Sequence, residues 1–255
     1  EAYANVNDNT TGASTKSEEE QARTAAAMKN VHFRRALSFG LDRASYNAQV
    51  NGEELKVNSL RNCFVPGNFV ALEEDTTVSI NGTDTTFPAG TYFGAIEQAQ
   101  IDADGVAIKV WDPDGNDGAG SSDGFDGWYN VDNAVAELDT AIEELSADGI
   151  TIDEENPIYI DMPYASSLEA YSNQANAYKQ SIEASLGGKV IVNLVDCVTS
   201  DGWYYAGYYA DYGYEANYDV YDVSGWSPDF GDPSTYLDTF LPDYAGYMAK
   251  CIGIY

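Results

Sequence analysis

The chain has 255 residues, of which 44% are hydrophobic and 13% aromatic, a composition typical of a folded globular protein. It carries 42 acidic and 12 basic residues, a formal net charge of −30. This balance argues against nucleic acid and anionic membrane surfaces as partners, because phosphate groups attract Lys and Arg. The same acidity is typical of a well-solvated surface.

The first part of the chain predicts helices. Residues 15–30 are polar and rich in alanine, which indicates a short helix or a loop insertion. Residues 33–50 repeat apolar side chains at helical spacing, which predicts one amphipathic helix. Its apolar stripe consists of Phe33, Ala36, Leu37, Leu41, Ala44 and Ala48.

Residues 71–127 change character and predict β-hairpins and loops. Asn81-Gly82 stands between two β-prone runs, the strongest short-range sign of a hairpin. Asp104-Gly105 repeats this arrangement and predicts a second hairpin turn. Residues 112–127 form a low-complexity loop.

Residues 128–226 alternate between strand and helix patterns, an order that predicts an α/β layered structure. Each helix has a recognisable start or stop residue. In chain order the elements are a helix from the Asn130 cap to Gly149, a strand over 157–162, a helix over 168–186 ended by Gly187-Gly188, an apolar strand over 189–195, a Tyr-rich helical stretch after Trp203 and a strand over 218–226.

Four motifs, in this order, resemble the solute-binding proteins of oligopeptide and dipeptide ABC transporters (extracellular solute-binding protein family 5). FRRALSFGLDR, residues 33–43, resembles the family's helix signature, with Gly40 where Ala is usual. Residues 129–145 resemble a second family helix without its proline and lysine, and residues 178–195 resemble the helix and strand that follow. The last motif, residues 218–240, resembles a family pattern that here contains Gly225, Trp226, Asp229, Asp232, Pro233 and Leu237.

The resemblance implies an α/β fold, a class II periplasmic-binding-protein-like lobe in which a mixed sheet is flanked by helices. We expect residues 1–255 to be a single ligand-binding lobe, the C-terminal lobe of a two-lobe protein. Residues 71–127 are expected to be a hairpin- and loop-rich elaboration within it.

The resemblance also implies a function without catalysis. The expected protein is the substrate-binding component of a peptide ABC importer, which captures peptides between two lobes and delivers them to a permease. Its expected partners are an oligopeptide and the permease subunits, with no nucleic acid, cofactor or metal. We expect a monomer outside the cell or in a periplasm, tethered as a lipoprotein in the full-length protein.

By the same resemblance, four residues form the peptide site. Asp229 is the expected anchor of the peptide's ammonium group, since a carboxylate near a strand end makes a charge-assisted bond to such a group. Gly225, Trp226 and Ser227 are expected to supply backbone groups for an added strand and a pocket wall. From the residues alone, a turn acid beside Pro228 and core packing of Trp226 remain alternative interpretations.

Parts of the sequence also permit two other classes of protein. Paired acids such as Glu143-Glu144 permit a carbohydrate-active enzyme, although chance pairs are expected in so acidic a chain. Asp112, Asp114 and Asn116 permit a calcium-dependent surface module, but the loop lacks the Gly and Glu that an EF-hand requires at its sixth and twelfth positions. No Gly-x-Ser-x-Gly or Walker-type sequence occurs.

The cysteines and the chain ends carry less information. Cys63, Cys197 and Cys251 are widely spaced and His32 is the single histidine, which argues against a zinc site and a Cys–His nucleophile. One disulfide with one free thiol fits the count. No apolar run approaches the roughly 20 residues of a membrane-spanning helix. The sequence opens at Glu1 without a signal-peptide pattern, so we expect it to be cut from a longer protein.

Overall fold

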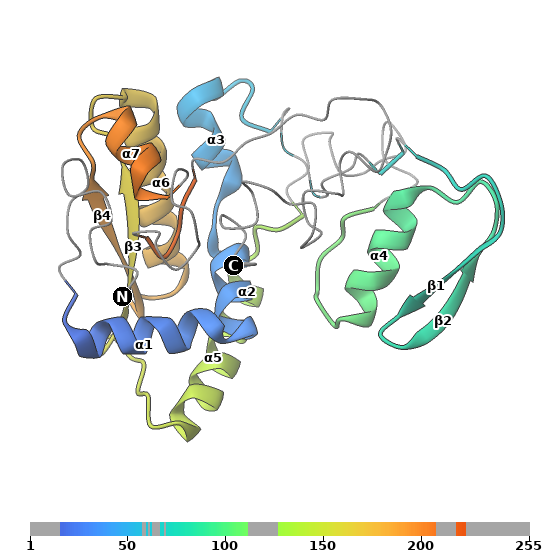
Figure 1. Ribbon diagram of the computed structural model, residues 1–255, viewed down its shortest axis with the longest axis horizontal. Coiled ribbons are helices and arrows are strands. Elements are labelled where there is room, and N and C mark those ends of the chain that lie inside the picture. Colours follow the sequence, from blue (N-terminus) through green and yellow to red (C-terminus); the bar gives the residue numbers. More distant parts are fainter. Residues whose placement is uncertain are drawn as a thin grey trace. The chain divides into compact units, whose positions relative to one another are not determined.

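The computed structural model describes residues 16–57, 60, 62, 67–68, 70–111, 127–207 and 218–222 (Figure 1). They fall into two compact units, one with residues 16–42, 130–207 and 218–222, the other with the described residues between 43 and 129. The second unit begins well before the elaboration expected at 71–127. That both units belong to one lobe stays a prediction.

The first unit contains a parallel pair of strands joined by a helix. β3 (Ile158–Tyr164) pairs with β4 (Val190–Asp196), and Ile158 lies opposite Val190. α6 (Glu169–Ser185) connects the two strands and packs against both. A parallel pair requires a crossover of this kind, and the predicted strand–helix–strand order is confirmed.

The described part of this unit contains four further helices: α1 (Glu18–Lys29), α2 (Val31–Gly40), α5 (Val131–Ala147) and α7 (Ser200–Ala206). α2 and α5 pack along each other and both contact α6, while α1 and α7 contact β3. The largest fully buried side chains of the unit are Trp203, Phe33, Phe39, Leu138, Ile158, Ile160, Met162, Ile182, Leu186 and Val190.

The predicted helix ends of this unit are confirmed. Asn130 caps α5 by accepting a hydrogen bond from the backbone N–H of Asn133 at 2.9 Å. Gly149 follows the last turn with φ of 83°, and its N–H donates to the Ser146 carbonyl. Gly187 and Gly188 likewise end α6 with positive φ.

The single helix predicted over 33–50 is wrong. α2 ends at Gly40, and α3 (Arg43–Asn51), in the second unit, begins three residues later. Leu41 has extended backbone angles (φ −84°, ψ 114°). The N–H of Asp42 donates to the Ser181 hydroxyl of α6 instead of to a helical carbonyl. A tertiary contact therefore overrides a continuous apolar stripe.

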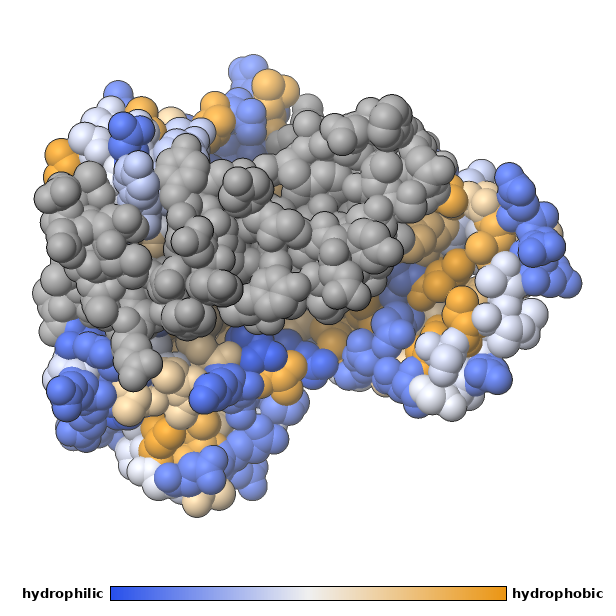
Figure 2. All heavy atoms as spheres, in the orientation of Figure 1, coloured by the Kyte–Doolittle hydropathy of each residue, from blue (hydrophilic) through white to orange (hydrophobic). Residues whose placement is uncertain are grey.

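The second unit contains the predicted hairpin. β1 (Thr76–Ile80) and β2 (Thr83–Phe87) pair antiparallel through Asn81 and Gly82, whose φ values of 48° and 78° suit a tight two-residue turn. Hydrophilic and intermediate residues cover the visible hairpin, in keeping with its Thr-rich sequence (Figure 2). Among the described residues this antiparallel pair and the parallel pair are separate sheets and do not form one mixed sheet.

The second predicted hairpin is wrong, because its first half is a helix. α4 (Phe93–Ala103) has Asp104 as its C-cap, and the next residue, Gly105, has a φ of 67° that closes the helix. The N–H of Gly105 donates to the Asp102 carbonyl, and that of Val106 donates to the Ile101 carbonyl. This is the Schellman pattern of a helix end.

Candidate functional site

The predicted peptide-site residues Gly225, Trp226, Ser227 and Asp229 lie outside the described residues, so their roles stay predictions. The proposed calcium loop at 112–123 also lies outside them. Of the strand predicted over 218–226, only residues 218–222 are described, and they are not assigned as strand. These five residues, called the docking segment below, are the described part of the chain closest in sequence to the predicted site.

The docking segment is bound to one edge of β3 at Asp161. The N–H groups of Asp219 and Val220 donate to the Asp161 carbonyl oxygen at 2.9 and 3.1 Å. In return, the N–H of Asp161 donates to the Asp219 carboxylate at 2.7 Å. The segment thus satisfies backbone groups of β3 that point away from β4.

A buried charge cluster, Lys16, Asp161 and Asp219, reinforces this attachment. The Lys16 ammonium donates to the Asp219 carboxylate and lies 3.5 Å from Asp161 Oδ2. The exposed fraction of the side chain is 1% for Lys16, 8% for Asp219 and 2% for Asp161. Asn193 of β4 donates to the other Asp161 oxygen at 3.2 Å. Two carboxylates therefore share one ammonium group away from water.

Burial shifts the titration of this cluster. It raises the pKa of Asp219 to about 7, against the opposing hydrogen bond from the Asp161 N–H. It also lowers the pKa of Lys16 to about 8, against the attraction of the Asp161 carboxylate. Both shifts have the same cause, since a low-dielectric environment disfavours the charged form of each group.

Aromatic packing attaches the docking segment to the carboxyl ends of the two strands. There, Ala165, Cys197, Trp203 and Ala206 form a buried cluster, against which Tyr221 packs. The Tyr221 hydroxyl donates to the Trp203 carbonyl at 2.8 Å. The Tyr221 ring stacks on that of Tyr218, with the ring centroids 4.7 Å apart. The carboxyl ends of parallel strands are the usual ligand side of an α/β sheet, so the segment is fixed beside that side.

The loop after β4 adds a strained residue. Val198 has φ of 63°, which β-branched residues rarely adopt, and it is 59% exposed. Its N–H and that of Ser166 donate to the Asp196 carboxylate at 2.7 and 3.1 Å, which links the ends of both strands. Burial alone would raise the pKa of Asp196, but these hydrogen bonds outweigh it and hold the pKa below its usual value. Cys197 is buried, and its thiol donates to the Val195 carbonyl, whereas Cys63 and Cys251 lie outside the described residues.

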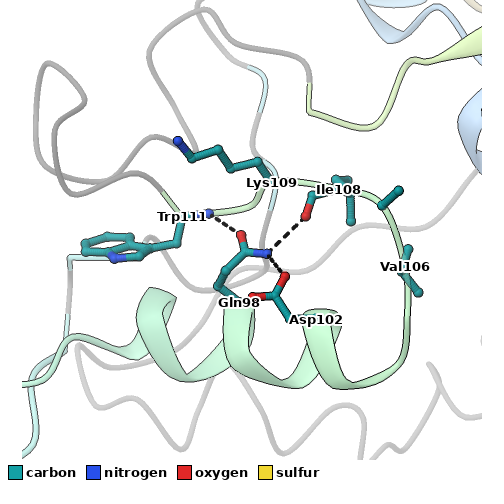
Figure 3. Close-up of a pocket in the computed structure, with 7 residues that line it drawn as sticks. Gln98, Asp102, Val106, Ile108, Lys109 and Trp111 are labelled. Carbon is teal, nitrogen blue, oxygen red and sulfur yellow. Dashed lines mark hydrogen bonds between the residues drawn. The ribbon is translucent and has the colours of Figure 1, made fainter.

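The second unit contains an open hollow of about 500 Å³ beside α4 (Figure 3). The Gln98 amide donates to the Ile108 carbonyl and to Asp102, and it accepts from the N–H groups of Val110 and Trp111. All the hydrogen-bonding capacity of this amide is therefore used within the protein. Gln98 holds the segment 106–111 against α4, and this gives it a structural role.

A metal site and a membrane-spanning helix are both absent from the described residues. These residues contain no group of three or more His, Cys, Asp or Glu side chains placed to hold a metal ion. None of their helices combines the length and the apolar character that crossing a bilayer requires.

Comparison with known proteins identifies relatives of this chain. The oligopeptide-binding protein AmiA of Streptococcus pneumoniae is 35% identical over 219 residues, which cover 86% of this chain and 29% of AmiA. SarA of Streptococcus gordonii is 34% identical over 89% of this chain and 30% of its own length, and AliA of S. pneumoniae is 31% identical over 94% and 34%. The chain is homologous to these oligopeptide-binding proteins over most of its own length. No family model matches it.

The resemblance seen in the four motifs is thus confirmed, and the described residues combine helices and strands as expected for an α/β fold. The chain spans about three tenths of the length of the curated relatives it matches. Two solved structures are similar to it: an oligopeptide ABC transporter substrate-binding domain from Bacillus anthracis (18% identity, TM-score 0.47, 86% of this chain and 30% of that one) and Listeria monocytogenes OppA bound to peptide (19%, 0.45, 87% and 31%).

Proposed function

We propose that this chain is part of the substrate-binding component of a peptide ABC importer, which captures oligopeptides outside the cell and delivers them to permease subunits. The observation that carries the proposal is the 35% identity to an oligopeptide-binding protein over 86% of the chain. The component is not an enzyme, and a lipoprotein tether in the full-length protein belongs to the proposal. No feature of the described residues favours the carbohydrate-active or calcium-dependent alternative.

In this proposal Asp229 is the counter-ion of the peptide's amino terminus. Gly225, Trp226 and Ser227 supply backbone groups and an apolar wall to the bound chain. The chain is the C-terminal of two lobes, and residues 71–127 elaborate it. The attachment of residues 218–222 to β3 supports the proposal, because it fixes the chain a few residues before this motif.

The test uses the full-length protein that contains this chain and isothermal titration with a peptide mixture of defined length. Asp229→Asn is expected to weaken peptide binding by about 2–5 kcal/mol, the range for removing one partner of a buried charge pair. An N-acetylated peptide should lose a comparable amount against the wild-type protein. Asp232→Asn, at a position expected to cap a helix, is the control and should leave affinity within about threefold. Equal binding of free and acetylated peptide would remove Asp229 from the site.

A further inference from the structure

We propose that the cluster of Lys16, Asp161 and Asp219 positions the peptide-binding part of the chain, and that the docking segment takes up a proton when it binds to β3. The link to peptide rests on the proposed function, whereas the link to protons rests on the cluster alone.

The proton requirement follows from the charges. With all three groups ionised, two carboxylates and one ammonium leave the buried cluster with one net negative charge. Asp161 Oδ2 is buried and has no hydrogen-bond partner within the described part of the chain, although it lies 3.5 Å from the ammonium. One added proton makes the cluster neutral, and an uncompensated charge in a low-dielectric site is costly.

The groups that face Asp219 define which residues titrate with it. The N-terminal side contributes Lys16, with Glu20 of α1 acting on the ammonium. β3 contributes Asp161, and β4 contributes the uncharged amide of Asn193. Asp222 of the docking segment acts on Tyr178 of α6 instead. The cluster has two carboxylates for one ammonium group, and burial raises the pKa of Asp219 to about 7, so we assign to Asp219 the proton that the cluster takes up on docking.

The direction of the pH dependence can be worked out from these groups. A solvated Asp219 titrates near 3.8, and the docked one near 7. Between these values the docked state holds more protons, so detachment becomes up to about tenfold more favourable for each pH unit gained. Lys16 acts in the opposite direction between about 8 and 10.5, because the docked ammonium loses its proton first. The segment is therefore held least tightly between about pH 7 and 8.

Docking and peptide binding are coupled if the docked segment sets the course of the chain toward residues 225–229. The segment is attached through backbone hydrogen bonds, the buried charge cluster and the Tyr221 hydroxyl. A peptide that binds only the docked state must in turn stabilise docking by the same factor, since coupling between sites is reciprocal.

The experiment is hydrogen exchange of residues 218–222 in the full-length protein, corrected for intrinsic exchange rates, at pH 5.5, 6.5 and 7.5. In the wild type the opening equilibrium of these amides should rise about tenfold between pH 5.5 and 6.5. Asp219→Asn should abolish this slope, because the amide does not titrate. Asp139→Asn, which changes an exposed carboxylate on α5, should keep the wild-type slope.

Equal slopes in wild type and Asp219→Asn would overturn the proton linkage. If Asp219→Asn fails to fold, a flat wild-type profile overturns it alone.

The peptide link has its own readout. Saturating peptide should lower the opening of residues 218–222 in the wild type, and Lys16→Met should weaken peptide binding by about tenfold or more. If peptide binds but leaves this opening unchanged, the positioning role is wrong. If peptide does not bind at all, the proposed function fails, while the pH slope still tests the cluster.

Discussion

The Ser181 hydroxyl donates to the Gly40 carbonyl at 2.9 Å and accepts from the Asp42 N–H at 2.7 Å, so one side chain of α6 satisfies both sides of the break after α2. Ser185, one turn later, donates to the same carbonyl at 2.8 Å. The two serines thus share the acceptor, but Ser181 alone serves the donor. Ser181 therefore makes two hydrogen bonds at the break and Ser185 makes one, so we expect their removal to differ in its effect on stability.

Ser181→Ala should destabilise the protein more than Ser185→Ala. Removing Ser181 leaves the half-buried Asp42 N–H without this acceptor, which costs about 1–3 kcal/mol, whereas Gly40 keeps one partner in either variant. Ser185→Ala should cost about 1 kcal/mol. Urea unfolding of both variants gives the comparison, and the reverse order would contradict this account of the break.

Val198→Gly should stabilise the protein. Val198 has a left-handed backbone conformation, which costs an L-residue roughly 1–2 kcal/mol, and its exposed side chain contributes little packing. Glycine removes that cost and loses about 0.5–1 kcal/mol through the greater freedom of the unfolded chain. We expect a small net gain, measured as a higher unfolding midpoint. Val198→Ala is the control, because alanine keeps a Cβ at this positive φ and should raise the midpoint less than glycine does.

Local signals in the sequence predicted the parts of the fold that depend on neighbouring residues. The Asn130 cap, the Gly149 stop and the Asn81-Gly82 turn each act within a few residues of the chain, and each is confirmed. The Asp104-Gly105 pair was misassigned because the same dipeptide closes a hairpin or a helix. The preceding residues 93–103 decide between these outcomes.

Features that depend on distant partners were not predictable in this way. The helix break at Leu41 requires Ser181, and Lys16 meets Asp219 across 203 residues of sequence. No periodicity in the sequence identifies such a pair. In so acidic a chain, a single residue such as Asp219 would be assigned to the surface. The predicted site at 225–229 came from resemblance alone, because the chemistry of a peptide anchor has no local pattern beyond one carboxylate beside an indole.

Gly94→Ala should destabilise the second unit. A Cβ at this position would lie 2.3 Å from Trp111 Cε3 and 2.9 Å from the Cα of Gly67, so the indole fills the space that the missing side chain leaves. Overpacking of this kind costs about 1–3 kcal/mol. Trp111→Leu, which removes the clashing ring, should restore at least half of that loss in the double variant, as a coupling energy between contacting residues.

Gly90→Ala is the matched control: its positive φ makes alanine costly, but nothing lies within 4 Å, so Trp111→Leu should not rescue it. Equal rescue of both variants in denaturant unfolding would show that the indole does not require glycine at position 94.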